Sequence, residues 1–198
     1  MTGMTGFVIR FVCMLVVLIS ALPAHAHSGS VAGGFIGGLA HPVFGADHVV
    51  AMVAVGLWGA FLGSPAIYLL PVTFPLIMAF GGILGIVGVP LPGTQIGIAF
   101  SAIVLGSMVA TAARLPLWLA VAIVAVFAIF HGHAHGAELP PGADALAFSA
   151  GFVVATGALH LAGIGFGLLA RWPAGKMTVR TLGAGIACAG IFFLGTAI

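Results

Sequence analysis

Charged side chains are nearly absent from this 198-residue sequence. Lys, Arg, Asp and Glu together make up 4% of the residues, whereas 62% are hydrophobic. A soluble domain carries about 25% charged residues, and disordered chains are rich in charge and poor in hydrophobic residues. This composition therefore excludes both a water-soluble globular protein and a disordered one. It predicts an all-α membrane protein.

Three other features are missing as well. Five basic residues in the whole chain are too few for a nucleic-acid-binding surface, so no nucleic-acid partner is expected. Cys13 and Cys188 form no C-x-x-C pair, which excludes a thiolate metal knuckle and a redox motif. The sequence also has no P-loop, and its predicted loops are too short for a nucleotide-binding domain. Neither ATP hydrolysis nor an ATPase subunit is indicated.

The first 26 residues have the pattern of a secretory signal peptide. Arg10 precedes an apolar run of about 12 residues, which is shorter than the roughly 20 that a membrane span needs. Pro23 then leads into the small-residue sequence Ala24-His25-Ala26. We predict cleavage after Ala26, which leaves residues 27–198 as one transmembrane domain that begins with His27; an uncleaved first helix is the alternative.

Hydropathy and the positions of glycine and proline predict a six-helix transmembrane bundle for the mature chain. The expected spans are 31–62, 66–88, 94–112, 115–133, 144–170 and 177–197. If both mature termini lie outside, Glu138 and Asp144 also lie outside or at the outer edge. Every basic residue of the mature chain then falls at a cytoplasmic end, as the positive-inside rule requires. These residues are Arg114, Arg171, Lys176 and Arg180.

The first predicted span contains three ionisable residues, His41, Asp47 and His48. Such residues are costly inside a membrane and usually face a partner or a polar cavity. Pro42 and several glycines interrupt this segment, and broken helices are tolerated where they line a site. On an ideal helix His41, His48 and Met52 share one face, with Asp47 beside them. We interpret this first motif as a cation site; a buried hydrogen-bonded cluster that only holds the bundle together is the alternative.

A histidine-rich second motif occupies residues 130–138, at the end of the fourth span. If the helix continues, His131, His135 and Glu138 form one stripe and His133 points away from it. Two imidazoles and a carboxylate suit a divalent cation such as nickel, cobalt or zinc. A solvated loop is the ordinary alternative for a histidine-rich tract, but this one continues directly from an apolar helix. We therefore predict metal capture at the second motif.

Four further residues are secondary candidates for metal ligation. His160 follows Thr156 in the fifth span, where a buried histidine bonded to a neighbouring helix is the alternative. Met52 falls on the histidine face of its predicted helix, although single methionines more often fill space in a core. His133 belongs to the second motif, and His27 would combine its imidazole with the new α-amine.

The sequence resembles the HupE/UreJ family of bacterial nickel permeases over essentially its whole length. The resemblance rests on the two motifs, in this order behind a signal peptide, and on a histidine in the fifth span. The residues that carry it are His41-x5-Asp47-His48 followed by Met52 and Val55-Gly56, then Phe130-His131-Gly132-His133-Ala134-His135-Gly136-x-Glu138, and Leu159-His160.

This resemblance implies energy-independent uptake of Ni²⁺ through the bacterial cytoplasmic (inner) membrane. The ion is the transported substrate, no organic cofactor is implied, and the metal would supply hydrogenase or urease maturation. The protein would be a transporter and not an enzyme, with a divalent metal ion and the lipid bilayer as partners; a homo-oligomer stays open. The implied ligands are His41, Asp47, His48, His131, His135 and Glu138.

Three other functions fit the same residues. Uptake of Co²⁺ or Zn²⁺ uses the same ligand types, because affinity order alone does not single out nickel. A membrane-embedded zinc-dependent hydrolase would use Asp47 or Glu138 as general base on a metal-bound water. A metal sensor or assembly subunit would bind metal without flux. We favour transport because we expect the two motifs at different depths of one path, with the second motif outermost and His160 innermost.

Overall fold

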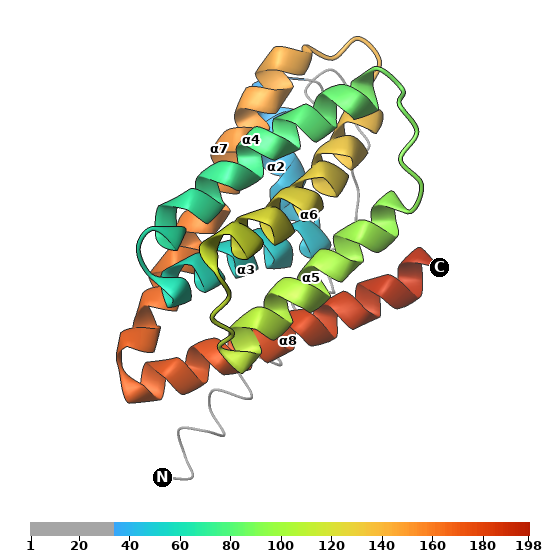
Figure 1. Cartoon of the computed structure of the whole chain (residues 1–198). Coiled ribbons are helices and arrows are strands. Elements are labelled where there is room, and N and C mark those ends of the chain that lie inside the picture. Colours follow the sequence, from blue (N-terminus) through green and yellow to red (C-terminus); the bar gives the residue numbers. More distant parts are fainter. Residues whose placement is uncertain (1–33) are drawn as a thin grey trace.

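The computed structural model describes residues 34–198, so the predicted signal peptide and His27 lie outside the described part of the chain. From residue 34 onward the fold is all-helical and contains no strand, which confirms the predicted fold class (Figure 1). The helices are α2 (Phe35–Phe44), α3 (Ala46–Leu62), α4 (Ala66–Ile86), α5 (Thr94–Thr111), α6 (Leu117–Ala137), α7 (Ala145–Gly167), the short 3-10 helix η1 (Leu168–Arg171) and α8 (Pro173–Ala197).

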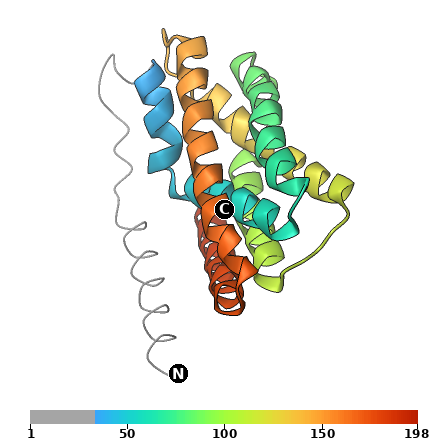
Figure 2. The same ribbon diagram turned by 90° about the vertical axis from the view of Figure 1, so that its left-hand side faces the viewer.

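Five helical segments between residues 34 and 198 are long and apolar enough to cross a membrane, namely α4, α5, α6, α7 with η1, and α8. The first predicted span, in contrast, is broken. Its two parts, α2 and α3, are bent by 84° relative to each other, and Gly45 between them has an extended backbone (φ −86°, ψ 102°). The single ideal helix assumed for His41, His48 and Met52 is therefore wrong. Figure 2 shows α2 beside α7 and α3 turning into the bundle.

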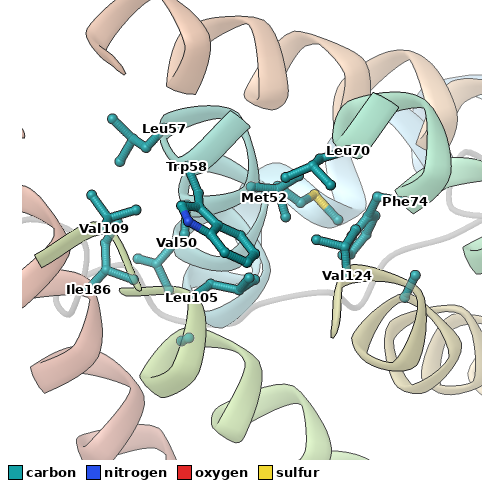
Figure 3. Close-up of a cluster of buried hydrophobic side chains, with 14 of the residues drawn as sticks. Val50, Met52, Leu57, Trp58, Leu70, Phe74, Leu105, Val109, Val124 and Ile186 are labelled. Atoms are coloured by element: carbon teal, nitrogen blue, oxygen red, sulfur yellow. The ribbon is translucent and has the colours of Figure 1, made fainter. Parts of the chain in front are cut away.

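The helix α3 is the centre of the bundle. It is apolar on nearly every side, and a helix of that kind is stable only where other elements cover it. The helices α4, α5, α7 and α8 all pack against it. Trp58 is fully buried, and its Nε1 donates a hydrogen bond to the carbonyl oxygen of Ala113 at 3.1 Å. Figure 3 shows Trp58 and Met52 of α3 within the apolar core that α4, α5 and α6 complete.

The two ends of the bundle carry opposite charges. Glu138 and Asp144 lie where α6 stops and α7 begins, which we call the acidic end. At the opposite, basic end, the Nε of Arg180 donates a hydrogen bond to the carbonyl oxygen of Ala110 at 2.7 Å. All basic residues that the structure describes belong to this basic end: Arg114, Arg171, Lys176 and Arg180. This separation agrees with the distribution predicted from the sequence.

Glycines allow the helices of the bundle to touch backbone to backbone. A Cβ on Gly56 of α3 would collide with the carbonyl oxygen of His160 on α7, and one on Gly132 of α6 would collide with that of Met78 on α4. Close packing through small residues is typical of membrane helices. Gly163 faces α3 in the same way. The helices that carry the histidines are therefore held in a fixed register.

We expect Gly56→Ala to lower the free energy of unfolding by about 1–3 kcal/mol, because the added methyl group overpacks the contact of α3 with α7. Gly157→Ala on α7 is the matched control, since a Cβ at Gly157 meets no atom within 4 Å. The control should be neutral or stabilising by up to about 1 kcal/mol, because alanine is the better helix former. The stability of both variants is measured by thermal unfolding in detergent, monitored by circular dichroism. Equal stability of the two variants would contradict the packing argument.

Candidate metal centre

Side chains from both histidine motifs meet near the acidic end. The ring centroid of His135 on α6 lies 4.7 Å from that of His41 on α2 and 4.5 Å from that of His48 on α3. The His48 ring in turn lies 5.1 Å from the ring of His131. The expectation of two separate groups at different depths is therefore wrong, because the rings of the two motifs alternate. We call these residues the histidine cluster: His41, Asp47, His48, His131, His135 and Glu138.

The bend at Gly45 explains why the two motifs interleave. It directs α2 along the first half of α7, where the backbone of Gly38 packs against the backbone of Phe148. The His41 ring thereby contacts Phe148, at a centroid distance of 5.7 Å, as well as His135. A straight helix would carry His41 away from α6. The break in the first span thus builds the cluster.

The outermost residues of the cluster are placed to hold a cation. One ligand atom each from His41, His135 and Glu138 lies within 4.8 Å of the other two, and His41 Nε2 is 3.8 Å from Glu138 Oε2. Atoms that share a metal ion at a bond length of about 2.1 Å are roughly 3–3.5 Å apart, so small side-chain movements are enough to close this site. Glu138 and His41 are 52% and 31% exposed, whereas His135 is buried. The site opens at the acidic end.

Asp47 fixes the orientation of His48. Its Oδ1 accepts a hydrogen bond from the backbone N–H of His48 at 2.9 Å and lies 2.8 Å from the ring Nδ1. With a carboxylate as its partner, Nδ1 carries the proton, and Nε2 presents its lone pair. Nε2 is buried and makes no hydrogen bond within residues 34–198. A carboxylate behind a histidine is the arrangement that orients histidine ligands in metal sites.

The deeper histidines of the cluster also present unpaired nitrogens. His131 is fully buried, and its Nδ1 donates to the carbonyl oxygen of Phe127 at 2.9 Å, which leaves Nε2 without a partner in the described chain. Neither ring nitrogen of His135 has a partner there. A buried polar atom without a hydrogen bond costs about 1–3 kcal/mol, and ion binding is one of the physical explanations for such an atom. These nitrogens are therefore candidate metal ligands.

The secondary candidates do not join the cluster. His133 lies on the other side of α6, as its helical position predicts, and its Nε2 donates to the carbonyl oxygen of Val89 at 2.7 Å. Met52 is fully buried in the apolar core, and His27 lies outside the described residues. His160 on α7 contacts the ring of Phe74, which in turn contacts His131 of the cluster.

Sequence reasoning missed the aromatic rings that wall the cluster. Phe152 of α7 lies 4.1 Å from His135 between ring centroids, and Phe74 of α4 lies 5.3 Å from His131. The missed signal is the spacing of four residues from Phe148 through Phe152 to Thr156, which places them on one face of α7. These rings give the imidazoles apolar neighbours. Low-dielectric surroundings of this kind strengthen the electrostatic attraction between a cation and its ligands.

The ligand types indicate which metal ions the cluster could hold. Imidazole nitrogens with carboxylate oxygens suit borderline divalent cations of the first transition row, including nickel, cobalt and zinc. Side-chain exposure falls from 52% at Glu138 to nil at His131. The cluster is therefore open to ions at the acidic end and closed toward the basic end.

Comparison with known proteins gives two matches. Residues 14–193 match the family model described as HupE / UreJ protein, a range that contains both histidine motifs. The chain is also 44% identical to Protein HupE of Rhizobium leguminosarum bv. viciae over 176 residues, which cover 88% of this chain and 92% of that relative. No solved structure matches the chain.

We expect His131→Leu to leave the metal-free protein as stable as the wild type, or more stable by about 1 kcal/mol, because it removes a buried unpaired nitrogen. Ni²⁺ at about 100 times its dissociation constant should stabilise the wild type by about 2.7 kcal/mol. The variant should lose most of that gain. Thermal unfolding with and without Ni²⁺ measures both effects.

The control for this experiment is His133→Leu. It removes the hydrogen bond to Val89 and should therefore lower stability without changing the response to Ni²⁺. A full nickel response in His131→Leu would show that the metal binds elsewhere.

Proposed function

The chain belongs to the HupE/UreJ family, and we propose that it is an energy-independent permease for Ni²⁺ in the bacterial cytoplasmic membrane. The observation that carries this proposal is the row of buried imidazole nitrogens without partners, which starts beside exposed Glu138 and ends at His131. The delivered nickel supplies hydrogenase or urease maturation. The protein acts as a transporter and not as an enzyme.

Capture begins at the acidic end. The carboxylate of Glu138 attracts the hydrated cation, and its distance of 3.8 Å from His41 lets both side chains share one ion. His135 completes this first site from the buried side. Because each imidazole replaces a water molecule, the ion loses its hydration shell in steps and never enters hydrocarbon as a bare charge.

Transfer then follows the alternating rings. His135 contacts both His41 and His48, so an ion held by the outer ligands meets the Nε2 of His48 before it leaves them. The negative charge of Asp47 offsets the charge of the ion in a medium of low dielectric constant. Its hydrogen bond to Nδ1 keeps the Nε2 of His48 free for the metal. His131 receives the ion next, at the closed end of the cluster.

The charge distribution supports the direction of transport. The basic end agrees with a cytoplasmic location under the positive-inside rule. On this basis we propose that the acidic end and both mature termini face the periplasm. Glu138 then faces the side from which nickel arrives. We propose this orientation together with the function.

A membrane-embedded zinc hydrolase is the second candidate, and the geometry favours it less. A general base must be free to accept a proton from a metal-bound water. The Oδ1 of Asp47 already accepts from the backbone and is paired with the ring of His48. Glu138, the other carboxylate of the cluster, is half exposed at the mouth. A row of successive ligands also suits transfer better than a single closed catalytic site.

We expect Asp47→Asn and His48→Ala to lower nickel uptake by at least about tenfold, as the loss of a metal ligand or its orienting partner does. Uptake of radioactive nickel in cells, normalised to the amount of protein in the membrane, measures this effect. His133→Ala is the matched control and should keep uptake near the wild-type rate, since its ring bonds to the loop between α4 and α5. Undiminished uptake in both cluster variants would remove the first motif from the transport site.

The purified protein in sealed vesicles should accumulate Ni²⁺ down its gradient without ATP. Unlabelled Ni²⁺ should compete with the radioactive ion more strongly than equal concentrations of Co²⁺ or Zn²⁺. Stronger competition by Co²⁺ or Zn²⁺ would reassign the cargo among ions that share these ligand preferences. Hydrolysis of lipid or peptide without metal accumulation would favour the hydrolase instead.

A further inference from the structure

Two buried polar side chains on α7 lie beyond the histidine cluster and take no part in the steps above. Thr156 is fully buried and His160 is 1% exposed. The hydroxyl of Thr156 and both ring nitrogens of His160 make no hydrogen bond within residues 34–198. Both groups therefore carry the cost of burial without the compensation that such groups ordinarily have.

Thr156 differs in its hydrogen bonding from three other threonines in the helices. A threonine hydroxyl inside a helix normally bonds to the carbonyl oxygen one turn earlier. Thr111, Thr178 and Thr181 do so, at 2.7, 3.2 and 3.0 Å. Thr156 has the same kind of carbonyl within its own helix and does not bond to it. Its buried hydroxyl therefore has no partner within the described residues.

Thr156 and His160 continue the face of α7 that contacts the cluster. Phe152, one turn before Thr156, packs against His135. His160, one turn after Thr156, contacts the ring of Phe74, with a centroid distance of 5.3 Å and an interplanar angle of 83°. Phe74 also contacts His131 at 5.3 Å. The pair on α7 therefore begins where the cluster ends and lies nearer the basic end.

A backbone carbonyl oxygen of α4, that of Pro71, lies beside His160. Pro75 has no N–H, so the carbonyl oxygen of Pro71 lacks its helical partner. This carbonyl faces the ring of His160 without a hydrogen bond of normal geometry. The hydroxyl of Thr156 and the imidazole of His160 thus share one face of α7, and the Pro71 carbonyl of α4 lies beside the imidazole. This is a nitrogen and oxygen ligand set that divalent transition metals accept.

We propose that His160, Thr156 and the Pro71 carbonyl form a second, inner site for the divalent cation. The inner site rests on the proposed transport function and extends it. It receives the ion from His131, around the ring of Phe74, and releases it toward the basic end. Capture at the histidine cluster does not need the inner site, whereas passage through the membrane does.

The experiment compares binding with flux for His160→Leu and Thr156→Val. Ni²⁺ affinity of the purified full chain in detergent is measured by titration calorimetry, and Ni²⁺ flux is measured in vesicles. We expect affinity for the cluster to stay within about twofold of the wild type, because neither variant removes a ligand of the cluster. Flux should fall at least about tenfold in both variants. Thr156→Ser, which keeps the hydroxyl, should transport at the wild-type rate and exclude a folding defect as the cause.

Three outcomes overturn the inner site. They are wild-type flux in His160→Leu, loss of cluster affinity together with flux in that variant, and equal loss of flux in Thr156→Ser and Thr156→Val. His135→Ala separates this failure from failure of the proposed function. If His135→Ala keeps both binding and flux, the histidine cluster is not the transport site, whatever the variants on α7 show.

Discussion

The cost of burying an imidazole nitrogen without a hydrogen bond is the constraint on which this structure depends. The described chain holds six such nitrogens, on His48, His131, His135 and His160, in a bundle whose interior has few other polar groups. These nitrogens destabilise the fold, so its stability must come from elsewhere. It comes from the largely buried helix α3 and from close glycine contacts between α4 and α6 and between α5 and α8. The side chains that hold the bundle together are thus different from those that we propose as ion ligands.

The cluster of buried imidazoles also requires the break between α2 and α3 at Gly45. Two half-helices can deliver His41 and His48 to one point from different directions, which a continuous helix cannot. A Cβ on Gly45 would lie 2.9 Å from Nδ1 of His48 and 3.2 Å from Oδ1 of Asp47, so a larger residue would press on the hydrogen bond that orients His48. Glycine at this position serves both the bend and the site.

Much of this arrangement follows from local sequence, and the part that does not has a physical reason. Hydropathy and charge gave the long helices and the separation of charge between the two ends, because both depend on each segment alone. The stripe of His131, His135 and Glu138 was predictable because α6 is a regular helix up to Ala137. The meeting of His41 with His135 was not predictable, since it depends on how α2 packs on α7 through Gly38 and Gly151. Of the inner pair, only His160 was predictable, because it is an ionisable residue in a predicted span. The unpaired hydroxyl of Thr156 is apparent only from the three-dimensional structure.

The position of Phe74 links the two proposed sites. Its ring contacts both His131 and His160, and it belongs to an apolar core that includes Met52, Leu70 and Val124. An ion cannot stay in such a core, so the Phe74 ring must move before the ion passes from His131 to His160.

The segment of α4 that carries Phe74 lies between Pro71 and Pro75. Each proline removes one helical hydrogen bond, which makes this turn easier to bend. The same Pro75 that loosens the turn also frees the carbonyl that faces His160. In the proposed path, Phe74 closes the cluster and the Pro71 carbonyl oxygen receives the ion, and both belong to one turn of α4. Movement of this turn therefore couples the opening of the cluster to binding at the inner site.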